Sequence, residues 1–199
     1  MGTDMPPERR AVFLDRDGVI NRLILNPATG EYEAPLTPGD FEFLPGVQDG
    51  LRTLQSAGFL LFLVSNQPNF AKGKSTLADL NAIHQKLIVG LAEANLAFAE
   101  SYYCFHHPRG VGNRYSRVCE CRKPSPYFLF QAQAEFNIDL GRSWMIGDRL
   151  TDIECGRKAG TRTILIAADG PHATHATQPD YAATGLAAAA DLILKLGRL

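Results

Sequence analysis

Two aspartates, Asp15 and Asp17, directly follow the apolar run Ala11–Leu14, and a glycine follows the second one. Two carboxylates separated by one residue can both point into one pocket if the chain turns at the end of a strand. One can then act as a nucleophile and the other as a general acid or base. The pair alone is weak evidence, because D-x-D sequences also occur in solvated turns.

Three further polar groups follow apolar runs or begin helix-like segments: Ser65-Asn66, Lys123, and Asp148 with Asp152. Taken singly, each has a structural explanation as a turn, a solvated lysine or a helix cap. Together they form the ordered series D-x-D-G, S-N, K-P and G-D-x-x-x-D, which is far more specific.

The elements that must position these residues alternate along the chain. We predict strands at five apolar runs: Ala11–Leu14, Phe59–Val64, Ser101–Phe105, Trp144–Ile146 and Thr163–Ala167. The spacing of apolar residues predicts helices over Val47–Ala57, Leu77–Ala94, Tyr127–Phe136 and Thr151–Ala159. Strand–helix alternation indicates an α/β fold with a mostly parallel sheet, covered by helices on both faces. In such sheets ligands bind beyond the carboxyl ends of the strands, where the polar residues stand.

Length and composition restrict the remaining possibilities. A chain of 199 residues, 45% hydrophobic, suits one well-buried domain over residues 1–199. The formal net charge of -1 argues against nucleic acid or an acidic membrane as the partner. The apolar runs are too short to span a membrane, and no signal-type segment stands at the start. We therefore expect a monomer in the cytoplasm, acting on a small molecule.

Three of the four cysteines fall within 18 residues, in the segment Phe105–Lys123 and just before it. Cys104-x-His106 and Cys119-x-Cys121 would supply three thiolates and one imidazole, the tetrahedral set of a structural zinc site. His107 is an alternative to His106. The loop ends at Arg122-Lys123, so a zinc ion would hold two cations at the mouth of the site and offset the entropy cost of a long polar loop.

The ordered motifs resemble the haloacid dehalogenase (HAD) superfamily across essentially the whole chain. The resemblance implies a three-layer Rossmann-like fold, with Asp15 as the nucleophile that forms an aspartyl-phosphate and Asp17 as the general acid and base. It also implies that Mg²⁺ is held by Asp15, Asp148 and the backbone carbonyl of Asp17. Ser65 and Lys123 would bind the transferring phosphoryl group, and Asp152 would position Lys123 or a metal-bound water. The chemistry agrees, because a phosphate dianion repels a carboxylate nucleophile unless a divalent metal and a lysine neutralise it. The intervals between the motifs leave no room for a separate cap domain.

Five stretches (FLDRDGVIN, SNQ…AKG, YYCFHHP, CECRKP and GDRLTD) closely resemble the heptose bisphosphate phosphatases of bacterial lipopolysaccharide and S-layer sugar synthesis. This resemblance implies removal of the C7 phosphate from D-glycero-D-manno-heptose 1,7-bisphosphate. It favours His106 as the ligand, and it implies that Asn66, Gln67, Pro68 and Arg122 line the substrate pocket. The sequence departs from the family at Pro68-Asn69-Phe70, at Arg149 and in the long loop Asn21–Asp40. These departures bear on the choice of sugar more than on the phosphatase chemistry.

Three alternatives remain at this point. Gly73-Lys74-Ser75 resembles the end of a nucleotide-binding P-loop, but the motif's first glycine would be residue 68, which is a proline without an N–H donor. A zinc-stabilised binding module would have no use for the intact D-x-D pair. Histidinol phosphate is the alternative substrate for a phosphatase of this type.

Overall fold

The computed structural model describes residues 8–27, 30–166 and 178–197. Its centre is a six-stranded parallel sheet in the order β5-β4-β1-β6-β7-β8. The bounds are β1 Ala11–Leu14, β4 Leu60–Asn66, β5 Glu100–Cys104, β6 Trp144–Gly147, β7 Arg162–Ile166 and β8 Tyr181–Ala183. The first strand lies in the middle, so the segments after β1, β4 and β6 come together at one edge of the sheet.

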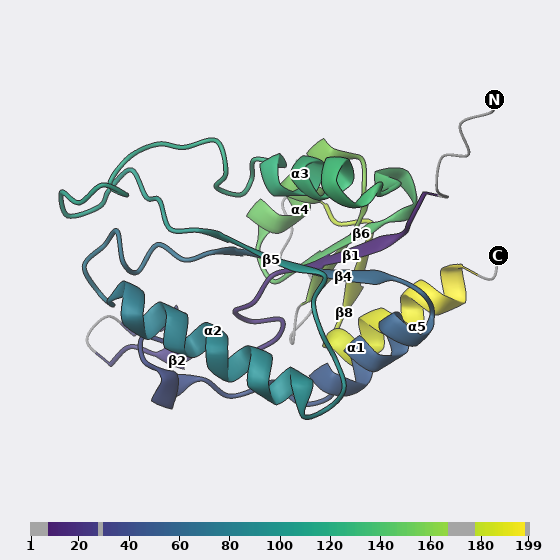
Figure 1. The fold of residues 1–199 in the computed structure, drawn as a ribbon, viewed down its shortest axis with the longest axis horizontal. Coiled ribbons are helices and arrows are strands. Elements are labelled where there is room, and N and C mark those ends of the chain that lie inside the picture. Colours follow the sequence, from purple (N-terminus) through teal and green to yellow (C-terminus); the bar gives the residue numbers. More distant parts are fainter. Residues whose placement is uncertain (1–7, 28–29, 167–177, 198–199) are drawn as a thin grey trace.

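Helices cover both faces of this sheet, which gives three layers (Figure 1). One face carries α1 Val47–Ser56, α2 Leu77–Ala92 and α5 Leu186–Leu196, packed on one apolar core. The other carries α3 Tyr127–Phe136 and α4 Leu150–Ala159, packed on a second core. The side chains of β1 alternate between the two cores, so β1 is buried on both faces. The expected α/β architecture is confirmed.

Most predicted elements are present, with shifted ends. The bounds of β1 and α3 agree with the prediction, and a capping box of Thr76 and Asp79 begins α2. The last predicted residue of Thr163–Ala167, Ala167, lies outside the described residues. The strand β8 and the helix α5 were not predicted.

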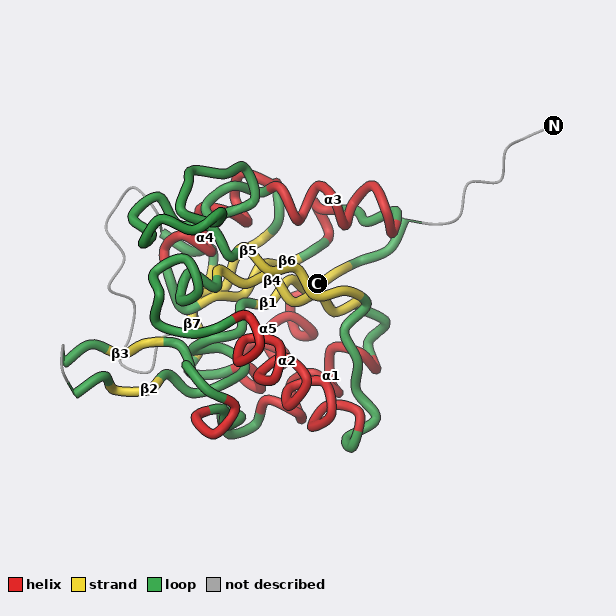
Figure 2. The backbone as a smooth tube through the Cα atoms, turned by 60° about the vertical axis from the view of Figure 1, so that its left-hand side comes forward, coloured by secondary structure: helices red, strands yellow, loops and turns green. Residues whose placement is uncertain are grey.

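The segment Asn21–Asp40 is more ordered than the predicted loop. It contains a two-stranded antiparallel hairpin of β2 Ile24–Leu25 and β3 Tyr32–Glu33, followed by a short 3-10 helix, Pro38–Asp40. A second 3-10 helix, Leu140–Arg142, precedes β6. The hairpin and the cysteine-containing loop lie at the same end of the molecule (Figures 1 and 2). The hairpin is on one face of the sheet and the loop is on the other. In the described part of the chain, no helix is long and apolar enough to cross a membrane.

Candidate active site

Three aspartates from separate parts of the chain meet beyond the carboxyl ends of β1 and β6. Asp15, Asp148 and Asp152 each have a carboxylate oxygen within 4.8 Å of the others. The buried Lys123 lies among them, with its Nζ 3.0 Å from Asp15 Oδ1 and 2.7 Å from Asp152 Oδ1. Lys123 Nζ also donates to the Val64 carbonyl at 2.6 Å. The structure thus brings four sequence-predicted residues into one cluster.

The charges of this cluster are not balanced by Lys123 alone. Burial, together with the charges of Asp15 and Asp152, raises the pKa of Asp148 to about 8. Burial likewise raises the pKa of Asp152 to about 6, although Lys123 opposes that shift. Burial lowers the pKa of Lys123, but the nearby charges of Asp15 and Asp152 outweigh it and raise that pKa above its ordinary value. A divalent cation would relieve this repulsion.

Two further observations fit a hard cation among these oxygens. Asp148 Oδ1 is buried and makes no hydrogen bond among the described residues. Gly18 has a φ of 83°, and a Cβ at this position would overlap the Asp148 carboxylate. The glycine that follows the D-x-D pair therefore allows the turn and leaves Asp148 room beside it. Carboxylate oxygens are the ligands that Mg²⁺ prefers in proteins.

Asp17 lies in a buried hydrogen-bonding network. Arg16 donates to Asp17 Oδ1 from Nη2 at 2.9 Å and from Nε at 3.1 Å. Asn21 Nδ2 donates to the same oxygen at 3.0 Å, and Gln67 Nε2 donates to Asp17 Oδ2. Both carboxylate oxygens are therefore held in place. Sequence reasoning missed Arg16 and Asn21, and the only available signal was an arginine between two aspartates at the end of a buried strand.

Gln67 belongs to the same buried network as Asp17. Its side chain is buried, and it also donates to Ser65 Oγ at 3.0 Å and accepts from Arg16 Nη2 at 3.0 Å. Gln67 is absent from the wall of the main cavity, where Asn66 and Pro68 are present. Side chains alternate in direction along a strand and at its end, so Gln67 points into the protein interior while its neighbours Asn66 and Pro68 face the cavity. The side chain contacts Asp17 and Ser65, and its contact with substrate stays a prediction.

Asn66 fixes the position of Lys123. Its Nδ2 donates to the Lys123 carbonyl at 3.1 Å, and its Oδ1 accepts from the Lys123 backbone N–H at 3.1 Å. This reciprocal pair ties the end of β4 to a residue 57 positions later. Asn66 therefore positions the lysine as well as facing the cavity.

A cavity of about 480 Å³ opens beside this cluster. Three segments form its walls: the hairpin with residues 31–34, the loop with residues 68–74, and the segment from Arg122 to Pro124. The start of α4 completes it. Each segment that departs from the family pattern in sequence contributes to this wall: residues 31–34 of the Asn21–Asp40 segment, Pro68 with Asn69, and Arg149. A volume of this size is typical of pockets for small molecules.

The P-loop alternative does not fit the geometry of residues 68–74. The N–H groups of Lys72, Gly73 and Lys74 donate to the carbonyls of Pro68, Phe70 and Asn69, so they are not free to cradle a phosphate. Lys74 Nζ lies 2.6 Å from Glu33 Oε1 instead of pointing toward a phosphate-binding loop.

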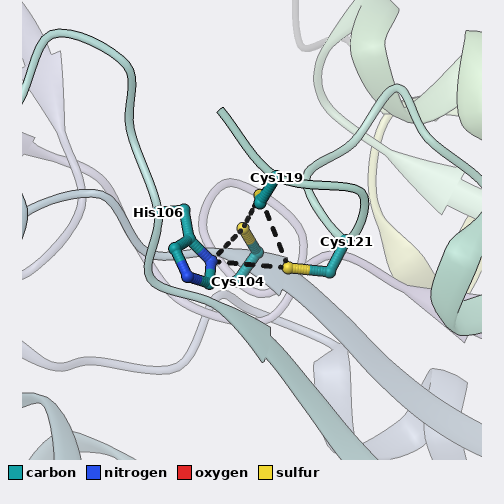
Figure 3. A group of neighbouring side chains, drawn as sticks. All are labelled: Cys104, His106, Cys119 and Cys121. Atoms are coloured by element: carbon teal, nitrogen blue, oxygen red, sulfur yellow. Dashed lines mark hydrogen bonds between the residues drawn. The ribbon is translucent and has the colours of Figure 1, made fainter. Parts of the chain in front are cut away.

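The cysteine-containing loop brings four potential metal ligands together (Figure 3). Cys119 Sγ lies 3.5 Å from both Cys104 Sγ and Cys121 Sγ. His106 Nδ1 lies 3.9 Å from Cys104 Sγ and 3.6 Å from Cys121 Sγ. Tetrahedral zinc with ordinary bond lengths requires S–S separations of about 3.8 Å and S–N separations of about 3.6 Å. The four atoms fit such a site.

His107 is turned away from this cluster. Its Nδ1 accepts a hydrogen bond from the Arg109 backbone N–H at 3.1 Å. Burial and the neighbouring Arg117 lower the pKa of His106, so its ring is neutral at pH 7 and can bind a metal. Spacing alone did not distinguish the two histidines, but the geometry favours His106 as the fourth ligand.

The same loop supports the cavity wall. Val111 donates its N–H to the Ala71 carbonyl at 2.8 Å, and Asn113 Nδ2 donates to the Phe70 carbonyl at 3.1 Å. Arg122 Nη1 donates to the His106 carbonyl at 3.2 Å. A metal at the four ligands would hold these contacts as well as the two cations that precede Pro124.

We expect Asp148→Asn to stabilise the protein when no metal is present. The folded-state pKa of about 8 lies above the ordinary value of 3.8, so ionisation weakens the folded state as pH rises between these values. In urea unfolding with EDTA, the variant should exceed wild type by more than about 1.4 kcal/mol at pH 8, which is the worth of one pKa unit. The difference should shrink at pH 5, and Mg²⁺ should stabilise only wild type. An equal difference at both pH values would contradict the clustered charges.

Comparisons with known proteins decide the family. A HAD-hydrolase-like family model matches residues 120–189. The D-glycero-beta-D-manno-heptose-1,7-bisphosphate 7-phosphatase of Salmonella typhi is 36% identical over 164 residues, which cover 82% of this chain and 83% of the relative. The enzyme of the same name from Escherichia coli K12 is also 36% identical, over 80% of both chains. The chain belongs to this family of HAD-like phosphatases.

The solved structures agree with this family at the level of the fold. D,D-heptose 1,7-bisphosphate phosphatase from B. bronchiseptica superposes with a TM-score of 0.75 at 26% identity. The match covers 94% of this chain and 99% of that one, whose crystals contain magnesium and phosphate. The HAD-like fold is therefore confirmed. In the described residues between β1 and β4, the chain forms only the hairpin, the first 3-10 helix and α1, without a cap domain.

Proposed function

We propose that this protein is a Mg²⁺-dependent phosphatase that removes the C7 phosphate of D-glycero-D-manno-heptose 1,7-bisphosphate. The observation that carries the proposal is the cluster of Asp15, Asp148, Asp152 and Lys123 beside a cavity of about 480 Å³. The 36% identity to phosphatases named for this reaction supports the substrate.

In the proposed reaction, an oxygen of Asp15 attacks the phosphorus and the bond to the sugar oxygen breaks. The Lys123 ammonium lies 3.0 Å from Asp15 Oδ1 and offers N–H donors to the phosphoryl oxygens. Asp17 gives its proton to the departing sugar oxygen and then takes a proton from the water that hydrolyses the aspartyl-phosphate. Ser65 is the second proposed donor to the phosphoryl group.

Mg²⁺ bound by Asp15, Asp148 and the Asp17 carbonyl would neutralise charge on the phosphoryl group. Asp152 holds Lys123 by its 2.7 Å contact, and Arg16, Asn21 and Gln67 orient Asp17. Zn²⁺ is the proposed occupant of the Cys104, His106, Cys119 and Cys121 cluster, where it would be structural because four protein ligands leave no open position.

A second group of cations suits a substrate with two phosphates. Lys72 and Arg122 both line the cavity. Burial lowers the pKa of Lys72, and the charges of Lys74, Arg122 and Arg109 lower it further. A bound anion would relieve this repulsion between cations. We propose that Lys72 and Arg122 meet the phosphate that is not hydrolysed.

Replacing Lys72 with methionine should therefore raise KM for the bisphosphate about tenfold, the effect of losing about 1.4 kcal/mol of binding. The effect on a sugar monophosphate should be clearly smaller. Lys158→Met is the matched control, because Lys158 pairs with Glu154 on the surface of α4, away from the cavity. Steady-state phosphate release gives KM for the bisphosphate and for the monophosphate. An equal increase in KM for the two substrates would contradict a role of Lys72 in binding the second phosphate.

A substrate panel tests the proposed function itself. Phosphate release is measured for the α and β anomers of the heptose bisphosphate, histidinol phosphate and fructose 1,6-bisphosphate, with Mg²⁺ or with EDTA. We expect the highest kcat/KM for one heptose anomer and no turnover in EDTA. A higher kcat/KM for histidinol phosphate would favour the alternative substrate, and no turnover of any ester would refute the phosphatase.

We also propose that the chain works as one cytoplasmic monomer with a single domain. One chain supplies every residue of the cavity wall, and the proposed thiolate site suits a reducing compartment.

A further inference from the structure

The stretch that resembles a P-loop binds a different part of the same chain. Lys74 Nζ lies 2.6 Å from Glu33 Oε1 on β3, and Ser75 Oγ donates to the Leu36 carbonyl at 2.8 Å. Both contacts connect the start of α2 to the segment that leaves the hairpin, about 40 positions earlier in the chain. The lysine and serine therefore anchor the hairpin from outside its own two strands.

Glu33 is well suited to this anchoring. Its side chain is only 11% exposed, and Asn26 Nδ2 donates to the same Oε1 at 3.0 Å. The hydrogen bond from Lys74 is the largest cause that lowers the pKa of Glu33, so this carboxylate is ionised at neutral pH. A two-stranded hairpin with two residues in each strand is not stable alone in water. The contacts of Lys74 and Ser75 thus fix where the hairpin lies.

The anchored hairpin presents an aromatic ring to the cavity. Tyr32 precedes Glu33 on β3, so their side chains point to opposite faces of the hairpin. Tyr32 is 64% exposed and forms part of the cavity wall. The wall also contains Pro68 and Asn69, and its cations include Lys72 and Arg122. Glu33 and Lys74 line the same cavity, so the anchoring pair lies beside the ring. Tyrosine offers an apolar face to the C–H groups of a sugar and a hydroxyl to its oxygens.

We propose that the β2–β3 hairpin, anchored by the Lys74–Glu33 ion pair, selects the sugar portion of the substrate through Tyr32. This inference rests on the proposed function, because it concerns the same cavity, and it assigns a role to the long Asn21–Asp40 segment. The phosphoryl group is bound at Asp15 and Lys123. The hairpin acts on the remainder of the molecule, so it discriminates between esters that share the same reacting phosphate.

The test compares two substrates in the full-length, metal-loaded protein: the heptose bisphosphate and phenyl phosphate, which has no sugar. Tyr32→Ala should lower kcat/KM for the bisphosphate about tenfold more than for phenyl phosphate. Tyr32→Phe, which keeps the ring, should recover most of this selectivity. Lys74→Met should reduce selectivity in the same direction, with Lys158→Met as the control for loss of a surface ion pair.

The pair itself is tested by combining Lys74→Met with Glu33→Gln. The double variant should lose little more selectivity than either single variant, because each already breaks the same contact. If wild type hydrolyses the bisphosphate and the Tyr32 and Lys74 variants keep its selectivity, the role of the hairpin is refuted and the proposed function stands. If wild type hydrolyses neither ester, the proposed function fails first. Circular dichroism and thermal unfolding establish that each variant is folded.

Discussion

Asp15→Asn is expected to reduce Mg²⁺-dependent phosphate release by more than about ten-thousandfold, as is typical when a nucleophile is removed. An amide oxygen carries no negative charge and is a poor nucleophile toward phosphorus. The substitution also removes one of three clustered carboxylates and leaves Lys123 with Asp152 as its partner. Because repulsion in the cluster is relieved, the variant should remain folded.

The measurement is phosphate release at saturating substrate, with Mg²⁺, together with thermal unfolding of the same preparation. Asp49→Asn is the matched control, since Asp49 pairs with Arg52 on the exposed side of α1 and should leave the rate unchanged. A folded Asp15→Asn protein that keeps more than a few per cent of the wild-type rate, after separation from any contaminating phosphatase, would contradict the nucleophile assignment.

Cys119→Ser is expected to remove the metal from the loop and most of the activity. Cys119 Sγ lies 3.5 Å from two of the other ligand atoms, so its loss opens the tetrahedral set. The loop would then lose its hold on the segment that carries Arg122 and Lys123. Wild type should contain about one zinc ion per chain, as a four-ligand structural site requires. The variant should contain little zinc and unfold at a lower temperature.

Cys155→Ser is the control for this prediction. Cys155 is buried in α4, donates to the Ser125 carbonyl at 3.2 Å and lies outside the four-ligand cluster. The Cys155→Ser protein should therefore keep its zinc. The measurement is the zinc content per chain of both variants and of wild type, by elemental analysis. A Cys119→Ser protein with full zinc content, or a wild type purified without zinc and fully active, would contradict a structural zinc site.

Most of the fold could be predicted because the strands that carry the site are buried on both faces. Val12, Phe13 and Leu14 are fully buried, so β1 is a continuous apolar run, and the polar residues that follow it are easily recognised. The hairpin could not be predicted in this way. Its strands have two residues each, and its position depends on Lys74 and Ser75, which are distant in sequence.

The helix α5 was missed for a related reason. Its buried face combines the small residues Ala189 and Ala190 with Leu186 and Ile193, so its large apolar side chains recur seven residues apart instead of every three or four. In the described residues, α5 packs closely on α1 at the buried Gly50, where a Cβ would overlap the Leu186 backbone. Such close packing depends on a tertiary contact that neither segment reveals alone.

In the site, residue types indicated which groups carry charge but not which way each side chain points. Asp15 and Asp148 follow strands and Asp152 lies in the first turn of α4, all at the same edge. Lys123 joins them because Asn66, at the end of β4, binds its backbone. Gln67, two residues after Ser65, was expected to line the substrate pocket, and its contact with Asp17 could not be predicted from the residue type. Its direction depends on the buried Arg16, whose guanidinium needs acceptors on both sides.

The most direct test of the account is ³¹P NMR of the heptose 1,7-bisphosphate during incubation with wild-type protein. With Mg²⁺, we predict that the C7 phosphate resonance is replaced by inorganic phosphate while the C1 resonance persists, and that EDTA stops the change. Loss of the C1 phosphate instead, or no Mg²⁺-dependent release of phosphate, would contradict the proposed reaction.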